Sequence, residues 1–326
     1  MSSEDLGRVI QMVNGYRHTA LLMAATQSGL IDHLDAGPSD AETLSTELKL
    51  DRDALERFLR ALKGAGLVHQ EGLLYSLTPT GAFLTRSGFG GGLRAWADLV
   101  GGEYYQAWGG LTESLRTGRA AFPEAFGMTA WEHRRMNPEM NAAFQRMATG
   151  EQRRTLSKLL RLYEFPEGCC IVDVGGGEGS LVRGIRKKYQ NVRGVLFDLP
   201  QVIGEVESGE IELETGSFLE KVPSGGDVHL LKHVLHNWTD DECVTILRNC
   251  EKALNEDGRV LILEHLLCED DPELAMMDLH MMLVLGGRER TQEQYEKLLS
   301  RAGLKLVGTT VLGKGLPAVL DARRAS

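Results

Sequence analysis

The sequence predicts a doubly wound α/β domain that follows a smaller, mostly helical domain. A glycine-rich turn, Gly175–Gly179, joins a short apolar run to a helix-like segment, and further apolar runs alternate with helical patterns downstream. The length of 326 residues exceeds what a single hydrophobic core usually serves. We therefore expect one domain over residues 1–95 and another over 96–326, the second divided into a helical part, 96–162, and an α/β core, 163–326.

Composition and charge restrict the kinds of partner. The chain is 42% hydrophobic and 25% charged, which is ordinary for a globular protein, and its net charge is −10. So acidic a chain is not expected to bind nucleic acid or an anionic membrane. No segment resembles a signal peptide or the roughly 20 apolar residues that span a bilayer. The five cysteines lack metal-ligand spacing, so we expect reduced thiols, no metal and a cytoplasmic location.

The first domain has the pattern of a winged-helix module. Helical spacing of apolar residues covers 1–35, and two shorter helices follow. Ser39 with Glu42 predicts a capping box for the first of them, and Asp51 predicts the N-cap of the second. The next stretch, LVHQEGLLYSLT, alternates around Glu71-Gly72, which predicts a β-hairpin. The order helix, helix, hairpin is that of a winged helix.

Two functions are open for such a module, namely DNA binding and dimerisation. Residues 1–95 contain nine lysines and arginines against eleven acidic residues, a poor match for a phosphate backbone. We therefore expect a dimerisation module. A ligand-sensing winged-helix regulator remains the less favoured alternative.

Residues 96–162 are predicted to be helical and are rich in large aromatic and methionine side chains, although the chain is only 6% aromatic. Such helices could form an apolar roof over a site in the α/β core, a shape that suits a planar aromatic substrate. Ordinary core packing accounts for the same pattern, so both interpretations stay open.

The α/β core is predicted from alternating strand and helix patterns. We expect parallel strands at Ile171–Val174, Val192–Phe197, Glu210–Glu214, Asp227–Lys232 and Arg259–Leu263, and a hairpin-like finish at Leu304–Val311 and Leu316–Leu320. The helix after the fourth strand starts at the capping box Thr239–Glu242 and is predicted to stop at Gly258. Thr291 with Gln294 opens the last helix in the same way.

Polar or glycine residues follow the strands at the edge where open α/β sheets bind ligands. The third glycine of the turn is misplaced for the G-x-G-x-x-G pattern of dinucleotide domains, which disfavours an NAD-dependent oxidoreductase. The spacing Asp173-x-Gly175-x-Gly177-x-Gly179 suits S-adenosylmethionine, which has no pyrophosphate to cradle. Asp198, one strand–helix–strand unit later, can hold both ribose hydroxyls.

Six segments in order resemble the caffeate/acetylserotonin-type O-methyltransferases, S-adenosylmethionine-dependent enzymes of plants and bacteria. They are VDVGGGEGS, FDLPQVI, GSFLEKVP, LLKHVLHNWTDDEC, VLILEHLL and GGRERT. The resemblance covers nearly the whole chain, because that family also has an N-terminal, winged-helix-like dimerisation domain. It implies a Rossmann-like methyltransferase fold, the cofactor S-adenosyl-L-methionine, a homodimer and a small aromatic substrate.

The same resemblance implies roles for individual residues. The general base falls on His236, and its supporting acids fall on Glu264 and Glu289. The implied cofactor contacts are Gly175, Gly177, Asp198, Ser217, Phe218 and Lys232. The acceptor pocket is expected to include Met147, Met281 and Leu285.

Three positions depart from the family pattern. Ser217 stands where plant members have an aspartate, so it cannot offer a carboxylate to the adenine amine. His233 stands where tryptophan is common, and Asn237 where aspartate is frequent. None of the three removes a reacting group.

The implied chemistry is consistent with these residue types. A neutral histidine, with a reference pKa of about 6.5, can take the proton of a phenol near neutral pH. Glu264 can fix its tautomer and stabilise the imidazolium. We expect O-methylation of a phenolic hydroxyl. N-methylation, or chemistry other than methyl transfer in the same fold, is the alternative.

Overall fold

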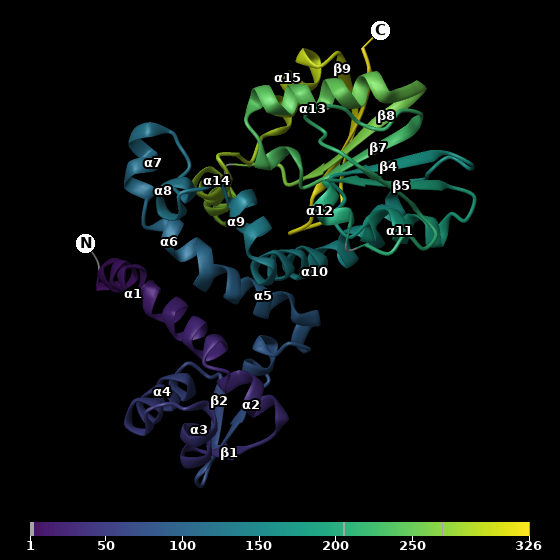
Figure 1. Cartoon of the computed structure of the whole chain (residues 1–326). Coiled ribbons are helices and arrows are strands. Elements are labelled where there is room, and N and C mark those ends of the chain that lie inside the picture. Colours follow the sequence, from purple (N-terminus) through teal and green to yellow (C-terminus); the bar gives the residue numbers. More distant parts are fainter. Residues whose placement is uncertain (1–2, 205, 269, 326) are drawn as a thin grey trace. The chain divides into compact units, whose positions relative to one another are not determined.

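The computed structural model describes residues 3–204, 206–268 and 270–325 (Figure 1). The chain divides into two compact units. The first comprises residues 1–106 and 137–150, and the second comprises residues 107–136 and 151–326. Among the described residues, no helix is long and apolar enough to cross a membrane.

The first unit is built from helices around a small sheet. Its elements are α1 (Ser3–Gln27), α2 (Leu30–Ala36), β1 (Ser39–Asp40), α3 (Ala41–Leu48), α4 (Arg52–Gly64), β2 (Val68–Glu71), β3 (Leu74–Leu77), two 3₁₀ turns, η1 (Gly81–Leu84) and η2 (Gly88–Gly91), α5 (Gly92–Leu99) and the π-helical turn η3 (Val100–Tyr104). The strands are ordered β1-β3-β2, and β2 and β3 form the predicted hairpin. Its core contains the fully buried side chains of Leu30, Ile31, Leu44, Leu59 and Leu62.

The helical stretch predicted over residues 1–35 is interrupted at Gly29, the residue that punctuates its pattern in the sequence, because Gly29 takes a left-handed conformation with φ 78°. One cap of this unit differs from the sequence prediction. The capping box predicted at Ser39 is wrong, since the backbone of Ser39 pairs with Tyr75. The N-cap of α3 is Asp40, whose Oδ1 accepts a hydrogen bond from the Thr43 amide at 2.8 Å. Asp51 caps α4, as predicted.

The second unit contains a seven-stranded sheet within the described residues. Its strands are β4 (Cys170–Val174), β5 (Arg193–Asp198), β6 (Glu212–Thr215), β7 (Gly226–Lys232), β8 (Leu254–Glu264), β9 (Leu304–Val311) and β10 (Ala318–Arg324). The order is β6-β5-β4-β7-β8-β10-β9, with β4 to β8 parallel and β10 antiparallel to both its neighbours. From β4 the chain adds β5 and β6 on one side, and it then returns to add β7 and β8 on the other side. The strand order therefore reverses between β4 and β7, which is where such sheets have a crevice for a ligand.

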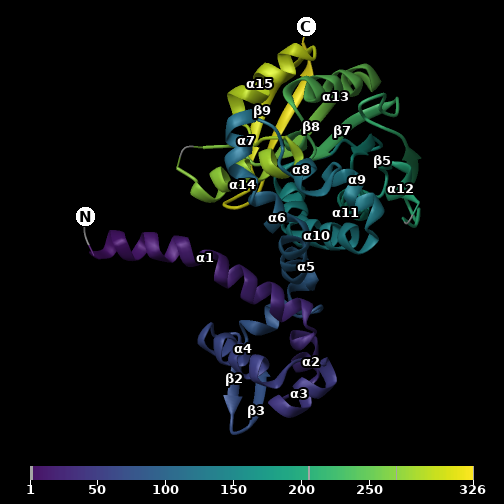
Figure 2. The ribbon, with the colours of Figure 1, turned by 60° about the vertical axis from the view of Figure 1, so that its left-hand side comes forward.

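Helices cover both faces of this sheet (Figure 2). One face packs on α13 (Asp240–Ala253) and α15 (Gln292–Arg301). The other packs on α11 (Ser180–Lys188), α12 (Pro200–Ile203) and the C-terminal half of α10 (Pro138–Leu162). The remaining helices are α6 (Tyr105–Trp108), α7 (Leu111–Thr117), α8 (Phe122–Phe126), α9 (Ala130–Met136) and α14 (Pro272–Leu285). The alternating strand and helix patterns of the sequence predict this arrangement, in which both faces of the sheet are buried under helices.

The predicted capping boxes at Thr239 and Thr291 are both present. The end predicted for α13 at Gly258 is wrong, because the helix ends at Ala253 and the chain passes directly into β8. Leu254 already pairs with Gly226 of β7, and this pairing replaces the last turn of the helix. All five cysteines lie in the described residues as free thiols, and only Cys268 is exposed.

The buried His229 of β7 predicts acid sensitivity of the fold. Its side chain is fully buried, and burial lowers its pKa to about 4. Between pH 6.5 and about 4 the unfolded chain binds a proton at this residue and the native chain does not, so stability falls with acidity by up to about 3 kcal/mol. Denaturant unfolding at several pH values should show a smaller loss of stability below pH 6.5 in His229→Gln than in the wild type. Equal losses would contradict the assignment.

Candidate active site

The glycine turn between β4 and α11 brings bare backbone to the crevice. Gly175, Gly177 and Gly179 all have left-handed φ values, of 71°, 60° and 74°. A Cβ on Gly175 would lie 3.0 Å from Val234 and 3.3 Å from the ring of Phe218. Any larger residue in this turn would be strained and would fill the space above the strand end.

Two carboxylates hold this turn, the buried Asp173 and the half-buried Asp198. Asp198, at the end of β5, accepts the Gly177 amide at 2.9 Å and the Leu199 amide at 2.7 Å. Asp173, on β4, accepts the Val182 amide at 3.3 Å. Burial raises the pKa of Asp173 to about 7 and also raises that of Asp198. Each carboxylate oxygen has two lone pairs, so Asp198 retains capacity to accept from ribose hydroxyls.

The other predicted cofactor residues converge on the same edge of the sheet. Phe218 follows β6 and meets the ring of Trp238 edge-on, with centroids 5.6 Å apart. The hydroxyl of Ser217 accepts the Leu219 amide at 3.3 Å, so it stabilises the local turn. Lys232 ends β7, and its charge acts on the carboxyl of Asp173. These contacts fit a ribose and a planar base beside the glycine turn.

His233, one of the three departures from the family pattern, has a strained backbone conformation beside Lys232. Its φ is 52°, a left-handed value that is costly for a side chain with a Cβ. Its ring lies between those of His236 and His265, with centroids 5.3 Å from each, and its Nδ1 is 3.2 Å from Lys232 Nζ. Burial and the neighbouring Lys232 lower its pKa well below the usual value, so the ring is neutral and accepts from the ammonium.

His236 lies in the 3₁₀ turn η4 (Leu235–Asn237), between β7 and α13. Its Nδ1 is 2.9 Å from Glu289 Oε1 and 3.7 Å from Glu264 Oε2. Its side chain is 13% exposed, whereas both carboxylates are fully buried. Because Nδ1 faces carboxylates, it carries the proton, and Nε2 is left as the basic nitrogen.

The two glutamates have different tasks. Glu289 makes the short contact with the imidazole, whereas Oε1 of Glu264 accepts the backbone amides of Leu235 and His236 at 2.9 and 3.3 Å. Burial alone would lower the pKa of His236, but the charges of Glu264 and Glu289 outweigh it and raise the pKa. Burial raises the pKa of Glu264, opposed by the nearby His236.

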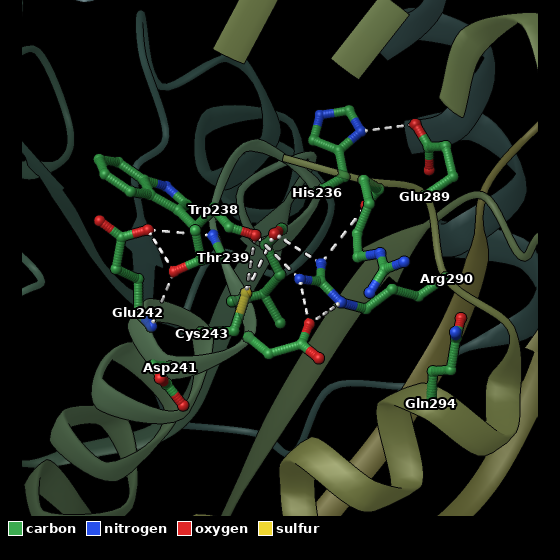
Figure 3. A network of polar contacts seen from close by, with 12 residues as sticks. His236, Trp238, Thr239, Asp241, Glu242, Cys243, Glu289, Arg290 and Gln294 are labelled. Carbon is green, nitrogen blue, oxygen red and sulfur yellow. Dashed lines mark hydrogen bonds and ion pairs between the residues drawn. The ribbon is translucent and has the colours of Figure 1, made fainter. Parts of the chain in front are cut away.

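The segment Gly286–Thr291 fastens the turn that carries His236 (Figure 3). The Arg288 amide donates to the carbonyl of His236 at 2.9 Å, and the Glu289 amide donates to Asp278 of α14 at 2.8 Å. A Cβ on Gly287 would lie 2.0 Å from the carbonyl oxygen of His236. Only a glycine allows the two backbones to approach this closely.

α14 supplies the side of the site where an acceptor is expected. Met281 is buried on this helix, and Leu285, half-buried, is its last residue. Trp108 Nε1 donates to Nδ1 of His280 on α14 at 3.2 Å. Burial lowers the pKa of His280 to about 4, so it is neutral and carries its proton on Nε2. Met147 lies on α10 in the first unit and is half-buried.

Sequence reasoning missed several residues of this site. Arg290, Asp278 and Gly287 lie in or against the Gly286–Thr291 segment, and nothing in their spacing marks them. Arg288 and Arg290 look alike in the sequence, yet Arg288 is exposed and Arg290 is fully buried. The two arginines differ in burial, and a single sequence does not show whether a charged residue is buried.

His236, Glu264 and Glu289 also bring three ligand atoms within 4.8 Å of one another, close enough to hold a metal ion. The sequence spacing did not indicate this grouping. In the described residues the Nδ1 of His236 and Oε1 of Glu264 are already engaged in hydrogen bonds. The absence of a metal therefore stays a prediction.

Comparison with known proteins identifies two family domains. The O-methyltransferase domain matches residues 108–305, and the O-methyltransferase dimerisation domain matches residues 10–87.

Individual relatives match over almost their full length. The chain is 35% identical to the O-methyltransferase SfmM3 of Streptomyces lavendulae, over 93% of this chain and 96% of that protein. It is 37% identical to the 3-amino-4-hydroxybenzoate 4-O-methyltransferase of Streptomyces cremeus, over 94% of this chain and 87% of that protein. A solved structure of NcsB1, an O-methyltransferase from neocarzinostatin biosynthesis, holds S-adenosyl-L-homocysteine and 1,4-dihydroxy-2-naphthoic acid; it is 27% identical, with a TM-score of 0.84 over 94% of this chain and 96% of that one.

The close approach at Gly287 predicts a severe effect of its smallest substitution. In Gly287→Ala the new methyl group would overlap the carbonyl of His236, so the turn must shift. We expect turnover to fall by about 10²-fold, the effect of misplacing a catalytic group by about 1 Å. Gly308→Ala on β9 is the control, because a Cβ there meets nothing within 4 Å. Steady-state turnover near that of the wild type in Gly287→Ala would refute the clash.

Proposed function

The chain belongs to the O-methyltransferase family, and from this premise we propose that it methylates a phenolic hydroxyl of a small aromatic molecule, with His236 as the general base. The enzyme depends on S-adenosylmethionine, which supplies an electrophilic methyl group. The observation that carries the proposal is the 2.9 Å contact between His236 Nδ1 and Glu289 Oε1, which leaves Nε2 basic.

The proposed residues divide into a base group and a cofactor group. Nε2 of His236 takes the phenolic proton as the oxygen attacks, and Glu289 stabilises the imidazolium that forms. Glu264 holds the backbone of the turn and adds a second negative charge. We assign the methyl donor to the edge formed by Gly175, Gly177, Asp198, Ser217, Phe218 and Lys232.

The acceptor is proposed to lie against α14, with Met281 and Leu285. Met147 is a further pocket residue that the family resemblance implies. The relative named for 3-amino-4-hydroxybenzoate and the NcsB1 structure that holds 1,4-dihydroxy-2-naphthoic acid support a planar aromatic ring that bears a hydroxyl. The apolar and sulfur side chains of these positions suit such a ring. These two compounds are the natural first members of an acceptor panel.

Replacement of the base tests the proposal. In His236→Ala we expect turnover to fall by about 10²- to 10⁴-fold, the usual share of general base catalysis. Binding of S-adenosylhomocysteine, measured by calorimetry, should stay unchanged, because His236 is assigned to the acceptor side. Near-normal turnover of the variant would exclude His236 as the base. The assays are run in EDTA and again with Mg²⁺, so that a dependence on a metal would be detected.

Glu289→Gln gives the matching test of the carboxylate. The base must be neutral, so kcat/KM falls as the pH drops through the raised pKa of His236. Loss of the negative charge lowers that pKa, and the acid limb of the pH profile should move to lower pH. If the acid limb does not move, Glu289 does not raise the pKa of the base.

We further propose that the enzyme is a homodimer that works in the cytoplasm, with the first domain ending near residue 95. The dimerisation-domain match to residues 10–87 supports the dimer. The exposed apolar side chains of α1 also support it; they are Leu6, Val9, Ile10, Met12, Val13 and Tyr16, each at least half exposed. The order α3, α4, hairpin supports a winged-helix-like module, and the free thiols support a reducing compartment.

Charges placed on α1 should break the dimer. We expect Ile10→Asp with Val13→Glu to shift the mass in light scattering after size exclusion from two chains to one. Leu73→Glu is the control, because Leu73 is 80% exposed at the hairpin turn and lies outside α1. A double variant that keeps the mass of two chains would exclude this face as the dimer contact.

A further inference from the structure

Arg290 is a fully buried cation with a complete set of hydrogen bonds (Figure 3). Nε and Nη2 donate to Oδ1 of Asp240 at 3.0 and 2.7 Å. Nη1 donates to the carbonyls of Leu235 at 3.0 Å and Arg288 at 3.4 Å, and Nη2 also donates to the carbonyl of Trp238 at 2.8 Å. An arginine has five N–H groups, and all five find an acceptor here.

Two of these acceptors lie on either side of His236 in the sequence. Leu235 precedes it and Trp238 follows it by two residues, so one planar group holds both ends of the turn that presents the imidazole. The preceding residue, Glu289, holds the imidazole itself. Two successive residues of one segment thus fix the main chain and the side chain of the same histidine.

A contribution to the stability of the fold does not by itself explain why an arginine is buried at position 290. Burial of a charge costs several kcal/mol, and a well-packed apolar side chain often serves a core at least as well. The guanidinium offers instead a rigid fork that cannot lose its proton and that fixes several acceptors at once. A lysine has three donors on one nitrogen at the end of a flexible stem, so it lacks the planar fork that holds these carbonyls and Asp240 in one fixed arrangement.

We propose that Arg290 is a positioning residue for His236, with Asp240 as its counter-ion, and that it acts on catalysis only by holding the turn that carries the base. This proposal rests on the proposed role of His236. A displacement of about 1 Å at a catalytic group can cost about 10²-fold in rate.

The first test compares neighbouring residues of α13. Asp240 pairs with Arg290, while Asp241, next along the chain, is 89% exposed and pairs with Arg301 at 2.5 Å. We expect Arg290→Lys to lower kcat by about 10²-fold and Asp240→Asn by about tenfold, with Asp241→Asn unchanged. The KM values for S-adenosylmethionine and the acceptor, and the affinity for S-adenosylhomocysteine, should stay within about threefold, because the turn is assigned to chemistry and not to binding.

Rates are expressed per competent site, counted from the stoichiometry of S-adenosylhomocysteine binding. This count separates poor folding of a variant from slow catalysis. If kcat per competent site is normal in both variants, or if only KM changes, Arg290 does not position the base. If Arg290→Lys does not fold, Asp240→Asn alone decides between these outcomes.

A double-mutant cycle tests whether Arg290 acts through His236. Once His236 is alanine, no base remains to be positioned, so Arg290→Lys should lower the residual rate by less than about threefold. A further loss of the full 10²-fold in that background would overturn the positioning role. Such a result would leave His236 as the base, whereas normal turnover of His236→Ala alone would overturn the proposed function.

Discussion

The hydrogen bond between His236 Nδ1 and Glu289 Oε1 is the contact on which the arrangement of the catalytic edge depends. His236 lies in a single 3₁₀ turn and Glu289 in an irregular segment, so neither is fixed by a long helix or strand of its own. Glu264, at the end of β8, accepts the backbone amide of Leu235 in the turn of His236. Arg290 donates to the carbonyls of Leu235 and Trp238 in the same turn. The segment of Glu289 is held in turn by Asp278 of α14. The proposed base is therefore held by strand, loop and helix together, which is how buried networks fix a geometry.

The edge to which we assign the cofactor is organised by a different constraint, the close approach of backbone. Left-handed glycines after β4 let the chain turn sharply, and Asp198 and Asp173 bind its amides. Burial raises the pKa of both carboxyls. Backbone amides oppose this rise at both residues, and Lys232 also opposes it at Asp173. Lys232 links the two edges, because it acts on Asp173 and contacts His233, whose ring lies 5.3 Å from that of His236 at a tilt of 30°.

Much of the fold could be predicted because its signals are local. The strand periods, the glycine turn and the caps at Asp51, Thr239 and Thr291 depend on neighbours in sequence. The errors arose where a distant strand competed. The local pattern predicts a cap at Ser39, but the backbone of Ser39 pairs with Tyr75. It also predicts that α13 runs to Gly258, but the helix ends at Ala253 because Leu254 pairs with β7. A prediction from neighbouring residues does not include a pairing partner that is distant in the sequence.

The sequence by itself determined the α/β class and which residue types stand at the strand ends. Through its motifs it also pointed to S-adenosylmethionine and to His236 with two acids. The tertiary structure decided which acid does what: Glu289 contacts the imidazole, and Glu264 chiefly holds the backbone. It alone separated the buried Arg290 from the exposed Arg288. The reason is physical, since charge and spacing are properties of the chain, whereas burial and contact between residues 235–238 and 287–290 exist only after the sheet and α14 bring them together.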